Sequence, residues 1–199
     1  SAGDSRILLD IGRPLDAPED SAGLLPRTLD LERPLAGVLI SHPHQDHYGL
    51  LCEAPADWPV FCGEGTRRLM AITEALRRRA LAQTITTWRS GRRLQIGPFR
   101  ITPRLTDHSA FDAHMLLIEV AGKRILYSGD FRTHGRKSAL PRGLMAYPPR
   151  DLDVLVMEGT NLGSGKLTKS EKDLEADFVR LFRETPGRVF VAWSAQNID

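Results

Sequence analysis

Three of the six histidines lie within six positions, in the stretch SHPHQDHYG at 41–49. In an extended segment, His42 and His44 point to the same side, and Asp46 and His47 follow where the chain is expected to turn. Imidazole and carboxylate groups are ligands for zinc, and also for manganese or iron. A polar loop that is merely rich in histidine is the alternative. The spacing after a run rich in Val and Ile favours a metal site.

Two further ligand-type residues occur later in the chain, each just after an expected strand. His108 lies in LTDHSAFDAH (105–114), and Asp130 lies in RILYSGDFR (124–132). Side chains at strand ends are held by the sheet behind them, which fixes a site better than a free loop does. Taken alone, Asp130 fits a turn aspartate equally well. Together with the histidine stretch, both residues are predicted to complete a metal site.

A basic segment, FRTHGRK at 131–137, follows Asp130 directly. Arg132, Arg136 and Lys137 place three cationic groups within seven residues of that carboxylate. Arginine binds phosphate through a bidentate fork, so the segment predicts contacts with a phosphodiester substrate. A solvated basic loop explains the same residues equally well.

The elements that must position these groups are mostly short strands. A helix is expected over 65–83, a short one over 45–52, and another over 170–187, where Ser170 and Asp173 suit a capping box. Gly122 lies in a tight turn expected at 121–123. This mixture predicts an α+β fold in which helices cover sheets. Apolar runs predict strands at 6–12, 35–42, 59–63, 84–88, 93–96, 99–105, 114–120, 124–128, 151–158 and 188–193.

Composition excludes several classes of protein. The 199 residues include 27 Lys and Arg against 25 Asp and Glu, so the net charge of +2 excludes a general polycation. Two cysteines, Cys52 and Cys62, make no disulfide framework and favour a reduced, cytoplasmic setting. No signal-peptide pattern and no apolar run of about 20 residues is visible, so no membrane association is predicted.

Four motifs occur in an order that resembles the metallo-β-lactamase superfamily: ILLDIG (7–12), SHPHQDHYG (41–49), TDHSAFDAH (106–114) and YSGDFR (127–132). VLVMEGTN (154–161) and VFVAWSAQNID (189–199) are similar to segments of its β-CASP branch, the ribonuclease J-like nucleases. The resemblance implies an αββα sandwich. It also implies that residues 1–188 are the N-terminal portion of the metallo-β-lactamase-like domain and that 189–199 begin a β-CASP-like region.

The resemblance further implies a site for two metal ions, with Asp46 and Asp130 as the catalytic carboxylates and Asp130 as the bridge. Asp10 would support the histidine loop, and Glu158 would orient a ligand histidine from outside the ligand set. The implied ligands are His42, His44 and His108 for the first ion, Asp46 and His47 for the second, and Asp130 for both. One more histidine of the second site is expected beyond Asp199, so that site is predicted to be weak or empty.

Two metals that share a water lower its pKa toward about 7, and the resulting hydroxide can attack phosphorus or a carbonyl carbon. The predicted function is metal-dependent hydrolysis of RNA or single-stranded DNA, with one or two Zn²⁺ ions or with Mn²⁺. One alternative is a hydrolase of small esters, thioesters or lactones on the same fold. Another is a non-catalytic portion that lacks the distal ligand. The sequence also leaves open whether the protein forms a homo-oligomer.

Overall fold

The first of two β-sheets is formed by the N-terminal half of the chain. The computed structural model describes residues 1–165 and 167–198, and all four strands of this sheet run parallel. Their order is β1-β2-β3-β4. The strands are β1 (Ile7–Leu9), β2 (Gly37–Leu39), β3 (Val60–Gly63) and β4 (Ile85–Trp88). Every residue of β2 is buried, as expected for an inner strand of a parallel sheet covered on both faces.

The second sheet has the order β5-β6-β7-β8-β9 and is antiparallel except for the parallel pair of β8 and β9. Ala121 and Gly122 join β7 to β8 with φ angles of +48° and +73°, which confirms the tight turn expected there. Positive φ at both positions matches the right-handed twist of the paired strands. The strands are β5 (Leu94–Ile96), β6 (Phe99–Leu105), β7 (His114–Val120), β8 (Lys123–Tyr127) and β9 (Val154–Val156).

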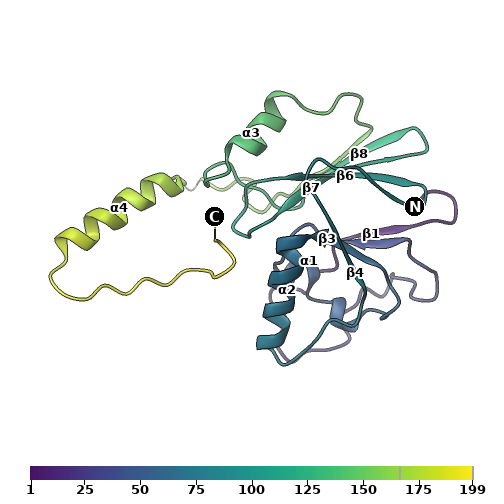
Figure 1. The fold of residues 1–199 in the computed structure, drawn as a ribbon, viewed down its shortest axis with the longest axis horizontal. Coiled ribbons are helices and arrows are strands. Elements are labelled where there is room, and N and C mark those ends of the chain that lie inside the picture. The colour runs from purple at the N-terminus through teal and green to yellow at the C-terminus, as the bar shows by residue number, and fades with distance from the viewer. Residues whose placement is uncertain (166, 199) are drawn as a thin grey trace.

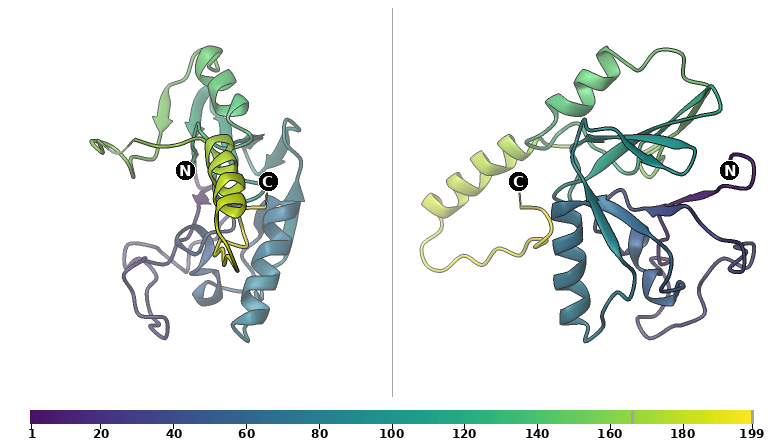
Figure 2. Two further views of the ribbon diagram at one scale, coloured as in Figure 1. Left: turned by 90° about the vertical axis from the view of Figure 1, so that its left-hand side faces the viewer. Right: turned by 45° about the vertical axis from the view of Figure 1, so that its right-hand side comes forward.

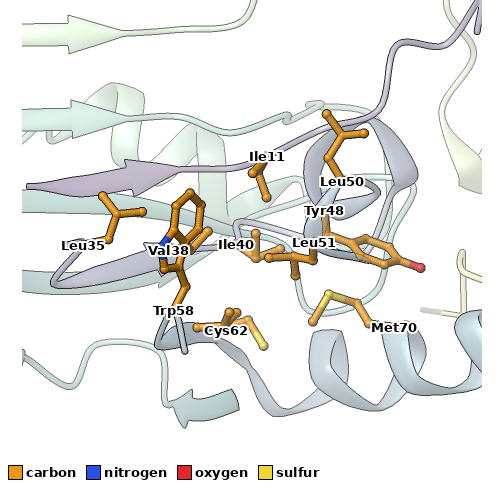
Figure 3. Packing of buried hydrophobic residues seen from close by; sticks show 11 residues of the cluster. Ile11, Leu35, Val38, Ile40, Tyr48, Leu50, Leu51, Trp58, Cys62 and Met70 are labelled. Atoms are coloured by element: carbon orange, nitrogen blue, oxygen red, sulfur yellow. The ribbon is translucent and has the colours of Figure 1, made fainter. Parts of the chain in front are cut away.

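Alternate residues of β2 and its extension pack into two different cores. Leu39 packs with Phe99, Ile101 and other apolar residues of the second sheet, so this core lies between the two sheets. Val38 and Ile40 belong to the other core, on the outer face of the first sheet. Figure 3 shows this outer core, in which Met70 of helix α2 takes part. Because successive side chains of a strand point to opposite faces of the sheet, β2 contributes to both cores.

Helices cover both outer faces. Helix α2 (Glu64–Leu76) packs on the first sheet through Met70. Helix α3 (Ala139–Ala146) lies against the second sheet, where Pro141 and Leu144 line an apolar cavity together with Met115. The layers are therefore helix, sheet, sheet, helix, which confirms the predicted α+β sandwich. Two short helical elements, α1 (Gln45–Tyr48) and a 3₁₀ turn (Leu51–Glu53), lie between β2 and β3.

Helix α4 (Glu171–Glu184) extends away from the sandwich (Figures 1 and 2). The predicted capping box is confirmed, because the Ser170 hydroxyl accepts from the Asp173 N–H and the Asp173 carboxylate accepts from the Ser170 N–H. No residue of α4 is buried, and β9 is likewise exposed along its length.

Two expectations about the elements were wrong, and one helix was missed. Residues 188–193 do not form a strand, and Phe190 and Trp193 are exposed, because no strand pairs with this segment. The helix expected over 65–83 ends at Leu76, and Arg78 has a positive φ of +57° that stops it. Helix α3 was not expected at all. None of the helices in the described part of the chain combines the length and apolar composition needed to cross a membrane.

Candidate metal centre

The ligand-type residues all lie just beyond strand ends or on the helix that follows. His42 and His44 come after β2, and His47 lies on α1. His108 follows β6, and Asp130 follows β8. Strands of both sheets thus deliver these groups to one place. The site therefore depends on how the two sheets pack together, and no single loop could build it.

Three histidines form a first group. The His44 Nδ1 atom lies 3.1 Å from His42 Nε2 and 3.1 Å from His108 Nε2. Nitrogen ligands about 2.05 Å from a tetrahedral Zn²⁺ ion lie roughly 3.3 Å from one another. These two distances are therefore close to the spacing that a tetrahedral cation requires, and the ligand atoms of all three histidines lie within 4.8 Å of one another.

A second group consists of His42, His47 and Asp130, and the ligand atoms of each group lie within 4.8 Å of one another. Asp130 faces both groups, because its Oδ1 lies 3.3 Å from His47 Nε2 and its Oδ2 lies 3.7 Å from His108 Nε2. His42 is shared by both groups, although the sequence assigned it to the first ion alone. Asp46 lies outside both groups, with its Oδ2 3.8 Å from His47 Nε2.

Asp10 holds the histidine stretch in place. Its Oδ1 accepts from the Ser41 N–H at 2.7 Å, and its Oδ2 accepts from the Ser41 hydroxyl at 2.7 Å. The same Oδ2 lies 2.7 Å from His47 Nδ1 and 2.5 Å from the Tyr127 hydroxyl. With its Nδ1 proton directed at Asp10, His47 turns Nε2 toward Asp130. Asp10 thus contacts the histidine stretch, and its supporting role stays a prediction. Tyr127 and Ser41 are partners that the sequence did not suggest.

Glycine at position 12 brings the first strand against helix α1. A Cβ atom there would lie 1.5 Å from the carbonyl oxygen of Asp46, so only glycine fits. The neighbouring backbone is bonded to the same helix: the Ile11 N–H donates to the His47 carbonyl at 2.7 Å, and the Arg13 N–H donates to the Gln45 carbonyl at 2.9 Å. The strand that supplies Asp10 thus also supports α1.

Burial sets the protonation of the first histidine group. It lowers the pKa of His42 and of His44, and it lowers the pKa of His108 to about 4, with further lowering by the neighbouring imidazoles. A neutral imidazole offers the lone pair that a metal needs. These three imidazoles are therefore neutral at pH 7 and can each offer a nitrogen lone pair to a metal ion.

His47 and Asp130 differ from that group because they pair with each other. Burial lowers the pKa of His47, but the carboxylates of Asp10 and Asp130 outweigh it and raise the pKa to about 10. For Asp130, burial opposes ionisation, but His47 and then His108 lower its pKa below the usual range. Positive and negative charge therefore face each other on this side of the centre.

Glu158 forms hydrogen bonds on both sides of Asp130. Its Oε1 accepts from the Phe131 N–H at 2.7 Å, and its own N–H donates to the Ser128 hydroxyl at 3.1 Å. It therefore contacts residues before and after Asp130. The role expected for it, orienting a ligand histidine, stays a prediction.

Arg132 is engaged with carboxylates of the protein. Its Nε donates to Asp107 Oδ1 at 3.0 Å, and its Nη2 lies 2.6 Å from Glu171 Oε1. Asp107 is fully buried and also accepts from the Gly135 N–H at 2.8 Å. Because Asp107 precedes His108, this pairing joins the His108 loop to the segment after Asp130. The sequence did not identify Asp107, and its place next to His108 was the only local signal.

The other two cationic residues of the basic segment also have partners. Arg136 Nη2 pairs with Glu175 Oε2 at 2.8 Å, and half of that arginine side chain is exposed. Lys137 Nζ lies 5.3 Å from the centre of the Phe111 ring. The phosphate contacts predicted for Arg132, Arg136 and Lys137 stay a prediction, and binding a phosphate would require exchanging these internal partners.

Known proteins share this fold and sequence pattern. A ribonuclease J of Mycobacterium tuberculosis is 28% identical over 173 residues, which cover 83% of this chain and 30% of that protein. A ribonuclease J of Helicobacter pylori is 26% identical over 183 residues, covering 82% of this chain and 25% of that protein. The chain therefore spans less than a third of the length of either relative.

A solved structure of a protein of unknown function from Enterococcus faecalis V583 superposes with a TM-score of 0.76. It is 21% identical and covers 93% of this chain and 53% of its own, so it supports the fold alone. The family model of the beta-lactamase superfamily domain matches residues 5–188. With the two-sheet sandwich and the histidine cluster at its sheet ends, this match shows that the chain belongs to the metallo-β-lactamase superfamily.

Proposed function

We propose that this chain forms the metal-binding centre of a hydrolase that cleaves phosphodiester bonds in RNA or single-stranded DNA. The observation that carries the proposal is the convergence of His42, His44 and His108 at 3.1 Å contacts, with Asp130 beside them. Three neutral imidazoles and a carboxylate suit Zn²⁺, and Mn²⁺ is the second candidate. A bound divalent cation supplies an acidified water and stabilises negative charge that develops on oxygen.

We assign the residues around the centre to two roles, orienting the histidines and binding metal. The Ser41 hydroxyl lies 3.0 Å from His42 Nδ1 and donates to Asp10, so it accepts a hydrogen bond from the Nδ1–H of His42. The unprotonated Nε2 of His42 then faces the cluster. Asp10 holds the Nδ1 proton of His47 in the same way. Asp130 lies between the two histidine groups and is assigned as the bridge, and Asp46 is assigned to the second ion. The second ion is expected to bind more weakly.

The substrate class rests on relatives. Both curated relatives described above are named ribonuclease J, at 26–28% identity. Phosphodiesters carry negative charge at the bond that is cut, which suits a cationic centre. RNA is therefore the first substrate to test, followed by single-stranded DNA.

The test separates metal binding from cleavage. Metal content is measured after loading with Zn²⁺ or Mn²⁺ and dialysis, and labelled RNA, single-stranded DNA and a panel of thioesters and lactones are then offered. Tightly held metal with metal-dependent cleavage of RNA or DNA is the expected result. Metal binding without cleavage of any substrate would make this chain a non-catalytic portion, and a failure to bind metal would refute the proposal.

A second candidate is hydrolysis of small esters, thioesters or lactones at the same centre. The pairing of Arg132 with Asp107 and Glu171, and of Arg136 with Glu175, favours it, because these cations are already neutralised. Cleavage of a thioester or lactone without cleavage of RNA or DNA in the same assay would select this candidate.

A further inference from the structure

A tight turn at residues 194–197 lies against the metal centre, beyond the matched region that ends at residue 188. The Ser194 carbonyl accepts from the Asn197 N–H at 3.1 Å, and the Ser194 hydroxyl accepts from the Gln196 N–H at 3.3 Å. Figures 1 and 2 show the chain returning from α4 toward α2 to reach this position. Both bonds lie within the turn and support its conformation.

Gln196 joins two of the loops that carry ligands. Its Nε2 donates to the Pro43 carbonyl at 2.9 Å, and its own carbonyl accepts from the Phe111 N–H at 2.8 Å. Pro43 lies between His42 and His44, and Phe111 lies three residues after His108. Gln196 thus connects the two loops that carry the histidines of the first group.

The Pro43 carbonyl is an effective place to hold the histidine stretch. The proline ring fixes φ near −65°, so ψ is the main backbone variable left at this position. Rotation about ψ moves the carbonyl and changes the direction in which His44 leaves the loop. A hydrogen bond from Gln196 to that carbonyl therefore restrains the angle between His42 and His44.

Asn197 anchors the turn on its other side. Its Oδ1 accepts from Arg132 Nη2 at 3.3 Å, and its Nδ2 donates to Glu171 Oε1 at 3.2 Å. Arg132 in turn contacts Asp107, next to His108. The turn therefore contacts the segments that carry all three histidines of the first group and the segment after Asp130.

We propose that Gln196 is a positioning residue for the metal centre, holding the His42–His44 stretch and the His108 loop at the spacing that a metal ion needs. The inference rests on the proposed metal-binding function. Gln196 itself is no ligand, and it acts through the Pro43 carbonyl and the Phe111 N–H.

The test compares Gln196→Met with Gln95→Met. Methionine keeps the length of glutamine but cannot donate to a carbonyl. Gln95 is a matched control, because its Nε2 also donates to a backbone carbonyl, that of Gly97, from the edge strand β5, which supplies no ligand. Co²⁺ is titrated into each metal-free protein, and its visible absorption reports both affinity and ligand geometry.

We expect Gln196→Met to bind Co²⁺ about tenfold more weakly than the wild type and to show a shifted spectrum, as with other partners that orient ligands. Gln95→Met should match the wild type in both. Thermal unfolding of the metal-free proteins is the folding control. If Gln196→Met fails to fold, Gln196→Asn replaces it, since it keeps the amide but is one methylene too short to reach Pro43.

The outcomes are distinguishable. Co²⁺ affinity within twofold of the wild type and an unchanged spectrum in the folded Gln196 variant would overturn this inference and leave the proposed function standing. If the wild type itself binds no Co²⁺ or Zn²⁺, the proposed metal centre is wrong, and the positioning role of Gln196 is refuted with it.

Discussion

The loops that carry the histidines and helix α4 are built in opposite ways. His42 is fully buried, and its neighbours are bonded to Asp10 and to the turn at 194–197, which are far away in the sequence. Helix α4 buries no residue. Glu171 and Glu175 in its first half contact Arg132, Arg136 and Asn197, and the rest of the helix depends on local devices such as the surface pairs of Asp177 with Lys169 and Arg180. Exposed ion pairs each contribute only about 0–1 kcal/mol. The candidate metal centre thus lies where non-local contacts are dense, and damage to the second half of α4 should stay local.

The sharpest test of this contrast is a matched pair of leucine truncations. Leu116 is fully buried between the sheets, whereas Leu181 on α4 is 48% exposed. We expect Leu116→Ala to lower the free energy of unfolding by about 3 kcal/mol, because it leaves a cavity. Leu181→Ala should cost less than about 1 kcal/mol. Denaturant unfolding measures both, and equal losses would show that α4 is part of the cooperative core.

Within the centre, Asp130→Asn should have the next largest effect. Asparagine keeps the shape of the side chain but removes the charge that faces His47 and His108. We expect weaker metal binding and at least about a hundredfold slower hydrolysis, because Asp130 is the proposed bridging ligand and a ligand matters more than the groups that orient it. Elemental analysis and the cleavage assay measure this, with circular dichroism as the check on folding. Unchanged metal content would leave Asp130 as a turn residue.

Asp10→Asn tests a residue that contacts the proposed ligand His47 but is not itself a proposed ligand. The amide can keep the size of Asp10 but cannot accept bonds from Ser41, His47 and Tyr127 at once. We expect a loss of about tenfold in metal affinity, since the orientation of His47 is no longer fixed. Co²⁺ titration measures this. Affinity equal to that of the wild type would mean that packing alone orients His47.

The smallest effect is expected at the start of α4. Ser170→Ala removes the side-chain half of the capping box and should destabilise the helix by about 1 kcal/mol. Because α4 buries no residue against either sheet, amide hydrogen exchange should quicken in α4 and stay unchanged in β6 and β7. Faster exchange in the two strands as well would contradict the separation of the two regions.

The sequence predicted the core strands well because their apolar runs are continuous and end at polar residues or turns. The strand expected at 114–120 has the same bounds in the structure. The run at 188–193 is also mostly apolar, but strand formation requires a partner, and none pairs with it in the described chain. Helix α3 was missed because Pro141 and Gly143 disfavour helix, yet Pro141 falls in the first turn, where its missing N–H costs nothing.

For the metal centre, local spacing predicted which histidines gather, but it could not show what holds them. Tyr127 and Asp10 are 117 positions apart, and Gln196 and Pro43 are 153 apart. Such long-range pairs cannot be recognised from the sequence, since nothing in the residues next to either partner indicates the contact. The partners of Arg132 were hidden for the same reason, and a segment that looked free to bind phosphate is engaged with Asp107 and Glu171.

The close approach of Gly12 to α1 has a consequence for how this protein can vary. Any side chain at position 12 would collide with the carbonyl of Asp46 and push α1, with His47, out of line. Position 12 carries no functional group, yet a deep mutational scan should find it as intolerant as the histidines. A designer who wishes to alter the first strand must therefore leave this position untouched or rebuild the ligand loop with it.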